Sequence, residues 1–175
     1  MEKRKVAKTS TLVTCLIIFI ISFLPKPNWY NVGIYAGCDV VNRLTYIFYH
    51  ANVIHASLNV WCLLSLVFIY NISVWRILLA IVMSITIPVN TLSLLIDSMS
   101  LPTVGISSVV FTLFGSISFE VQRKWYYQGW MIFYLSIGFL FPNTNAWLHL
   151  YCYIVGFIIA LLNKPVKRVH HVRKD

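Results

Sequence analysis

Residues 125–163 read WYYQGWMIFYLSIGFLFPNTNAWLHLYCYIVGFIIALLN and contain no Asp, Glu, Lys or Arg. A helix crosses the hydrocarbon of a bilayer with about 20 apolar residues, so these 39 residues suffice for two crossings. Pro142, Asn143, Thr144 and Asn145 interrupt the stretch with residues that are typical of turns. The stretch therefore predicts two membrane-spanning helices joined by a short loop.

The composition of the whole chain supports a membrane protein. Of the 175 residues, 59% are hydrophobic and 11% are charged, whereas soluble domains carry about 25% charged residues. The apolar content excludes a disordered chain. Four cysteines without paired spacing (three of them inside apolar stretches) exclude a disulfide scaffold and give no metal-binding pattern.

Further uncharged stretches indicate four more spans. The predicted fold is an all-α polytopic membrane protein with six transmembrane helices, at 9–24, 53–70, 75–95, 107–121, 125–141 and 146–162. Spans of this length exceed the roughly 9–11 residues of a barrel strand. We expect residues 1–175 to form a single domain, with short basic cytoplasmic tails at 1–8 and 164–175.

The distribution of basic residues predicts the orientation. If the N-terminus is cytoplasmic, twelve Lys and Arg residues fall on the inner side, and only Lys26 and Arg43 fall outside. Cytoplasmic loops of membrane proteins carry such an excess. Both termini are therefore expected in the cytoplasm, and the net charge of +9 reflects topology rather than nucleic-acid binding.

Few polar residues interrupt the predicted helices, and these are candidates for function because the bilayer penalises unpaired polar groups. They are His55, Asn59, Ser107, Ser108 and His149. Their three helices all run from outside to inside in the predicted topology. Since each residue is near the outer end of its helix, the side chains can converge just below the outer surface.

A serine beside a histidine can perform nucleophilic catalysis, because the imidazole takes the hydroxyl proton as the oxygen attacks a carbonyl. Gly105 precedes Ser107 at a predicted helix start, where free N–H groups can stabilise an oxyanion. Small residues indicate that the helices of Ser107 and His149 pack closely: Gly115 on the first helix, and Cys152, Gly156 and Ala160 on the second.

Together these residues resemble the rhomboid family of intramembrane serine proteases. Residues 50–59, HANVIHASLN, resemble the family's H-x-x-x-x-H-x-x-x-N pattern. Residues 105–108, GISS, resemble its G-x-S-x element, and His149 followed by Gly156 resembles its motif on the sixth helix. Six helices with both ends cytoplasmic match the minimal rhomboid core.

The resemblance implies a serine endopeptidase that cleaves transmembrane segments through an acyl-enzyme, without a cofactor or metal. It implies that Ser107 is the nucleophile and His149 the general base, with His55, Asn59 and the Ser107 N–H forming the oxyanion hole. Gly105, Phe111 and Gly156 would support the site, Phe111 by packing on the imidazole. Expected partners are transmembrane-helix substrates and the lipid bilayer, not nucleic acid, in a bacterial cell membrane.

Three departures from the family pattern bear on the site. Ser108 and Cys152 stand where glycine is often found, and the family's Trp-Arg pair is absent from the outer loop, where Arg43 is present but preceded by Val41-Asn42. Ser107 could alternatively be a helix cap, and His149, His55 and Asn59 could be structural hydrogen-bonding groups. Two other functions stay open: an inactive rhomboid-like protein that binds transmembrane helices, and a haem protein with two axial histidines.

Overall fold

The computed structural model describes residues 2–70, 72–141 and 144–162, and the regular secondary structure of these residues is helical, with one isolated β-bridge between Ile34 and Thr103. This confirms the predicted all-helical fold. The α-helices are α1 (Glu2–Ile21), α2 (Val40–Thr45), α3 (Val53–Ile69), α4 (Val74–Ile85), α5 (Val89–Leu92), α6 (Ser107–Ser116), α7 (Lys124–Gly138) and α8 (Ala146–Leu162), with 3-10 turns η1 (Trp29–Asn31) and η2 (Asp97–Ser100).

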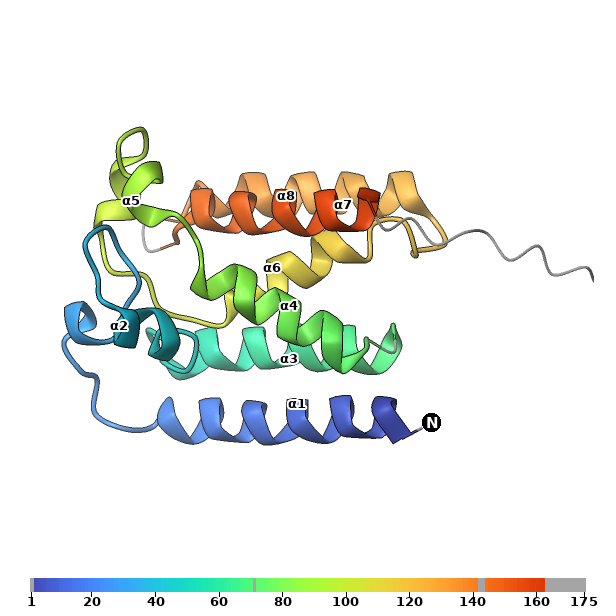
Figure 1. Ribbon diagram of the computed structural model, residues 1–175, viewed down its shortest axis with the longest axis horizontal. Helices are drawn as coiled ribbons and strands as arrows, with labels where there is room; N and C mark the ends of the chain where they lie inside the picture. Colours follow the sequence, from blue (N-terminus) through green and yellow to red (C-terminus); the bar gives the residue numbers. More distant parts are fainter. Residues whose placement is uncertain (1, 71, 142–143, 163–175) are drawn as a thin grey trace, which may run out of the picture.

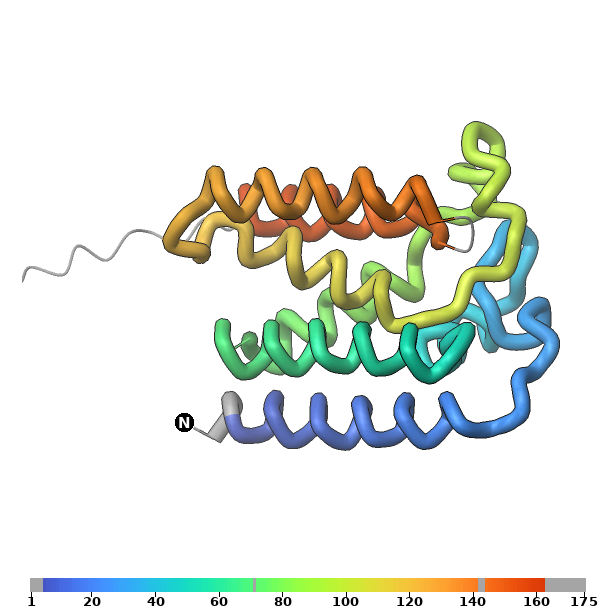
Figure 2. Tube along the Cα trace, turned by 180° about the vertical axis from the view of Figure 1, so that it is seen from behind, coloured from blue at the N-terminus to red at the C-terminus, as the bar shows by residue number. Residues whose placement is uncertain are grey.

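The six longer helices form an elongated bundle in which α6 is central (Figure 1). Helix α6 packs against α3, α4 and α8, and nearly all of its residues are buried. The starts of α3 and α8 lie at the same end of the bundle as α2 and α5, as the view from behind also shows (Figure 2). Side chains in the first turns of α3, α6 and α8 can therefore approach one another.

Side-chain caps define where several helices begin. Asn52 Oδ1 accepts a hydrogen bond of 2.8 Å from His55 N at the start of α3, and Ser73 Oγ accepts one of 3.3 Å from Arg76 N at the start of α4. Asn145 Oδ1 accepts one of 3.2 Å from Leu148 N at the start of α8. Asn and Ser are preferred at such positions because they satisfy N–H groups that the helix leaves free.

Three predicted boundaries are wrong. Helix α1 begins at Glu2, so residues 2–8 are helical rather than a separate tail, because Lys, Arg and Glu are good helix formers and no breaker precedes residue 9. Helix α4 ends at Ile85 instead of 95, since Pro88 cannot continue it. Helix α6 ends at Ser116 instead of 121, where the chain turns and Glu120 pairs with Arg76. The predicted tail 164–175 lies outside the described residues.

The segment between α1 and α3 covers the end of the bundle that carries the starts of α3 and α8. Asn42 Nδ2 donates to the carbonyls of Tyr30 and Gly33, which fixes the turn before α2. Arg43 Nη1 donates to the carbonyls of Ile85 and Ile87, at 3.2 and 2.8 Å, and so caps the end of α4. The bonds of Arg43 hold the segment against the end of α4.

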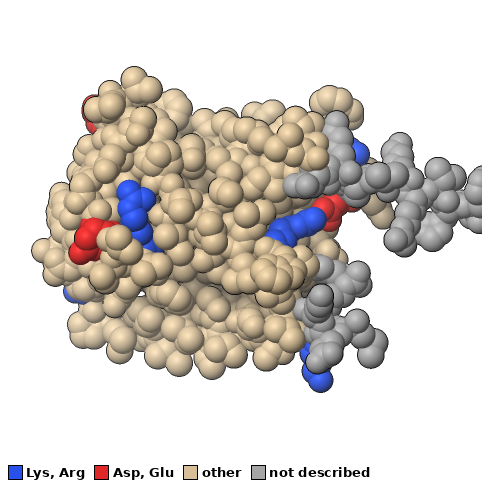
Figure 3. Space-filling view, in the orientation of Figure 1, with Lys and Arg blue, Asp and Glu red and all other residues tan. Residues whose placement is uncertain are grey.

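The outer surface of the bundle is largely apolar. Many large hydrophobic side chains are exposed, including Ile54, Trp61 and Trp125, at 74%, 72% and 90%. On the face drawn in Figure 3, the Lys, Arg, Asp and Glu side chains gather near the two ends and leave a broad uncharged band between them. Among the described residues, none of the helices combines the length and the apolar character that a membrane crossing needs.

Candidate active site

The first residue of α6 contacts α8 in the interior of the bundle. Ser107 Oγ lies 2.9 Å from His149 Nε2, which is hydrogen-bond distance. Ser107 is buried, with 4% of its surface exposed, and His149 is partly exposed. The contact expected between this hydroxyl and this imidazole is therefore present.

Two glycines bring α6 and α8 together. A Cβ atom on Gly115 would overlap the Tyr153 carbonyl oxygen, and one on Gly156 would overlap the Thr112 carbonyl oxygen. The backbones of the two helices are thus in direct contact, as small residues permit. This close approach brings the first turn of α8 within reach of the first turn of α6.

Phe111 fixes the orientation of the imidazole. Its ring stacks on that of His149, with 4.3 Å between centroids and 14° between planes. Among the described residues, no carboxylate hydrogen-bonds to His149, so the ring is held by Phe111 and Ser107 rather than by an acid. The arrangement is a serine–histidine pair supported by an aromatic ring.

The chain enters α6 through a glycine with a positive φ, and two backbone N–H groups of this turn are held by hydrogen bonds. Gly105 has a φ of +130°, a conformation that other residues rarely adopt. Gly105 N donates to the Tyr46 carbonyl at 2.9 Å, and Ile106 N donates to His50 Nε2 at 3.3 Å. Since the first N–H groups of a helix have no partner within it, Ser107 N is available to an anion.

The two predicted oxyanion residues of α3 differ in position. A Cβ on Gly105 would lie 3.3 Å from His55 Cε1, so His55 borders the turn before Ser107. Asn59 is buried, and its Nδ2 donates to the His55 carbonyl at 3.0 Å within α3. The structure thus brings His55 to the site and engages the Asn59 amide with its own helix; the oxyanion roles of both stay predictions.

His50 is also part of this arrangement. Its ring packs edge-on against His55, with 5.1 Å between centroids, and only 4% of the residue is exposed. Because Nε2 accepts a hydrogen bond from Ile106 N, the imidazole is neutral. Burial, together with the neighbouring His55, lowers the pKa of His50 to about 4.

Sequence reasoning missed Tyr46. This fully buried residue lies between α2 and α3, and its hydroxyl contacts Ser84 O at 3.0 Å and Ser108 Oγ at 2.7 Å. Burial raises the pKa of the phenol far above its usual range. Ser108, next to the candidate nucleophile, thus directs its hydroxyl to Tyr46. No local pattern signals the pairing, because its partners are 38 and 62 residues away.

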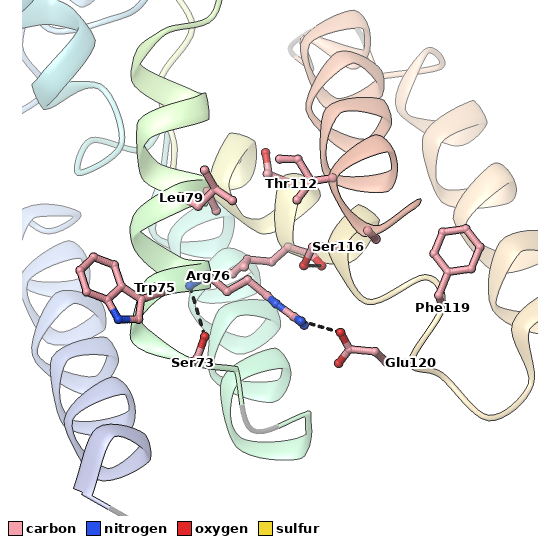
Figure 4. A pocket seen from close by; sticks show the side chains of 12 residues that line it. Ser73, Trp75, Arg76, Leu79, Thr112, Ser116, Phe119 and Glu120 are labelled. Carbon is pink, nitrogen blue, oxygen red and sulfur yellow. Dashed lines mark hydrogen bonds and ion pairs between the residues drawn. The ribbon is translucent and has the colours of Figure 1, made fainter. Parts of the chain in front are cut away.

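Two cavities lie near these elements. One, of about 270 Å³, lies beside the start of α8 and is lined by Trp29, Thr103, Val104 and Asn145 among others. The other, of about 360 Å³, lies between α4, α6 and α8, and the Arg76–Glu120 ion pair crosses it at 2.5 Å (Figure 4). Neither Ser107 nor His149 lines either of these two cavities; the first is lined by Val104 and Asn145, which precede α6 and α8.

The bundle and its serine–histidine pair define an all-helical protein with a candidate nucleophile between packed helices. A family model, the Rhomboid domain, matches residues 37–165, and the chain belongs to the rhomboid family. Its members are integral membrane proteins and in general serine intramembrane proteases, with inactive rhomboid-like proteins among them. No curated protein and no solved structure gives a significant match to the chain.

Proposed function

We propose that this rhomboid-family protein is an active intramembrane serine endopeptidase in which Ser107 and His149 form a catalytic dyad. The observation that carries the proposal is the 2.9 Å contact between Ser107 Oγ and His149 Nε2. A serine and a histidine in this relation are the minimum for nucleophilic catalysis. An inactive relative that only binds transmembrane helices would have no need of the pair.

In the first half of the reaction, Ser107 Oγ attacks the carbonyl carbon of the scissile peptide bond while His149 Nε2 takes the hydroxyl proton. The tetrahedral intermediate collapses as the carbon–nitrogen bond breaks, and His149 returns the proton to the leaving amine. The products of this half are a free amine and an ester on Ser107.

In the second half, water replaces the amine. His149 takes a proton from the water as its oxygen attacks the ester carbonyl, and the proton then passes to Ser107 Oγ as the carbon–oxygen bond breaks. A carboxylic acid is released and the enzyme is restored. Phe111 contributes by holding the imidazole plane throughout.

The oxyanion of both intermediates needs hydrogen-bond donors. The Ser107 N–H at the start of α6 is one donor, and His55, which borders Gly105, is a second. Each such donor typically contributes about 2.7–4 kcal/mol in the transition state. Asn59 Nδ2 carries two protons, of which one goes to the His55 carbonyl, so the second can serve as a third donor.

The proposed setting is a multi-pass position in a bacterial cell membrane, with α1, α3, α4, α6, α7 and α8 as spans and both termini in the cytoplasm. Membership of a family of integral membrane proteins supports this setting. The exposed apolar side chains and the uncharged band between charged ends support it as well (Figure 3).

The proposed substrates are transmembrane segments that unwind locally, since a regular helix hides its carbonyls from attack. Access requires α7 and the loop before α8 to move aside. Cross-linking α7 to α3 is therefore expected to block cleavage, and undiminished cleavage in the cross-linked protein would contradict this route.

Labelling with a fluorophosphonate, which reacts with activated serines, tests the proposed function on the purified full-length chain. We expect the unaltered protein and Ser108→Ala to become labelled, and Ser107→Ala and His149→Ala to stay unlabelled. Ser116→Ala, a change in the same helix but away from His149, is the matched control and should label normally. Labelling of Ser107→Ala would reject the proposed nucleophile, and no labelling of the unaltered protein would favour an inactive relative.

A further inference from the structure

Tyr46 contacts both sides of the candidate nucleophile, although it belongs to neither helix of the dyad. Its backbone carbonyl accepts a hydrogen bond of 2.9 Å from Gly105 N, two residues before Ser107. Its hydroxyl lies 2.7 Å from Ser108 Oγ, one residue after Ser107. One buried residue therefore holds the turn into α6 and the first turn of α6 at the same time.

The direction of the hydroxyl contacts follows from the number of protons. Tyr46 Oη also lies 3.0 Å from the Ser84 carbonyl oxygen, which can only accept. The single phenolic proton is therefore directed to Ser84 O, and Ser108 must donate its own proton to Tyr46 Oη. The result is a directed chain from Ser108 through Tyr46 to the last turns of α4, with each donor used once.

The anchor at the far end of this chain is rigid. Ser84 is completely buried on α4, and its hydroxyl donates to the Ala80 carbonyl at 2.8 Å. Arg43 holds the end of the same helix through the carbonyls of Ile85 and Ile87. A shift of Tyr46 would therefore break its hydrogen bonds to Ser84 on α4 and to Ser108 on α6. The Tyr46 hydroxyl is thus held in place by α4 and in turn positions the start of α6.

We propose that Tyr46 is a positioning residue for Ser107, which sets the place of the nucleophile relative to His149 by holding residues 105 and 108. The inference rests on the proposed function and extends it. A displacement of about 1 Å at a reacting atom can lower a rate by about 100-fold. One hydrogen bond to Tyr46 on each side of Ser107, at residues 105 and 108, limits such displacement. The serine at 108, where the family often has glycine, is then the partner that Tyr46 requires.

The test uses the rate of inactivation by a fluorophosphonate, which separates the reactivity of Ser107 (kinact) from binding of the probe (KI). Tyr46→Phe keeps the ring and removes only the hydroxyl. We expect kinact to fall about tenfold, the scale set by one unsatisfied buried hydrogen-bonding group, with KI unchanged. Ser108→Ala, a smaller change, should lower kinact similarly while still allowing complete labelling.

The double variant provides the sharper readout. Because both changes remove the same hydrogen bond, Tyr46→Phe combined with Ser108→Ala should lower kinact no further than the stronger single change. Tyr153→Phe is the matched control: its buried hydroxyl also has two hydrogen-bond partners, the side chains of Gln128 and Ser118, but neither holds Ser107. It should lower thermal stability and leave kinact unchanged.

The possible outcomes separate this inference from the proposed function. If Ser107 is labelled but Tyr46→Phe reacts at the normal rate, or changes only thermal stability, Tyr46 is not a positioning residue and the dyad stands. The inference would also be overturned if the reductions in kinact caused by Tyr46→Phe and Ser108→Ala added in the double variant. If Ser107→Ala is labelled like the unaltered protein, the proposed function fails and the role of Tyr46 fails with it.

Discussion

The close packing of α6 on α8 makes Gly156→Ala an informative perturbation. The added Cβ would overlap the Thr112 carbonyl oxygen and lie 2.9 Å from the carbonyl carbon and 3.1 Å from Ser116 N, whereas ordinary contact begins at 3.4 Å. These atoms belong to the backbone and cannot rotate away. The two helices must therefore separate locally by at least about 1 Å to restore ordinary contact.

Two opposing effects determine the change in stability. Alanine favours a helix over glycine by about 0.8–1.0 kcal/mol, but overpacking a closed interface costs about 1–3 kcal/mol. Since the obstacle is backbone, we expect the upper part of that range, and a net loss of about 1–2 kcal/mol in the free energy of unfolding. Because the Ser107–His149 contact spans the same interface, kinact for a fluorophosphonate should fall by about 100-fold.

The assay measures unfolding and inactivation on the same purified protein. Gly129→Ala is the matched control, because a Cβ on this α7 glycine meets no atom within 4 Å. It should be neutral or stabilising, by at most about 1 kcal/mol, with kinact unchanged. Gly156→Ala with the stability and kinact of the unaltered protein would refute the argument that α6–α8 contact sets the dyad.

The remaining predictions concern the aromatic support, a buried histidine and an ion pair. Phe111→Leu removes the stack on His149; because aromatic pairs contribute about 0.5–1.5 kcal/mol, kinact should fall roughly 2- to 12-fold, and an unchanged kinact would contradict the role. His50, which precedes α3, has its pKa lowered to about 4 from an ordinary value of about 6.5, so its contribution to stability is complete above pH 6.5. The free energy of unfolding should therefore fall by about 3 kcal/mol as the pH falls toward 4. If denaturation of His50→Gln shows the same dependence on pH, the titration of His50 is not the cause of this loss. Glu120→Gln breaks the ion pair with Arg76, in which both side chains are about one-third exposed. The free energy of unfolding should fall by less than about 1 kcal/mol, and kinact should not change. A larger loss would contradict this and would mean that the pair stabilises the closed cavity between α4, α6 and α8.

Local signals predicted the parts of the site that depend on single helices. The starts at Val53, Ser107 and Ala146 agree with the predicted ones, because an Asn precedes α3 and α8 and a glycine turn precedes α6. Since helices α3, α6 and α8 run in one direction, the convergence of Ser107 with His149 followed from topology, and the small-residue faces predicted close packing. The family match at residues 37–165 confirms the predicted membership of the rhomboid family.

Other features depend on contacts between distant residues and could not be predicted. Gaps between charges do not mark helix ends, which is why the start of α1 and the ends of α4 and α6 differ from the predicted ones. The Tyr46–Ser108 bond joins residues 62 positions apart, and the amide of Asn59 turns to a carbonyl of its own helix. Hydrogen bonds of this kind follow from the folded positions of side chains and leave no periodic trace in the sequence.

The most direct test of the central claim, that Ser107 is activated by His149, is to identify the residue modified by a fluorophosphonate. Mass spectrometric mapping of the labelled full-length chain should find one phosphonyl group, on Ser107, and none in His149→Ala. An adduct on Ser108 or another residue, or equal modification of Ser107 without His149, would contradict the claim.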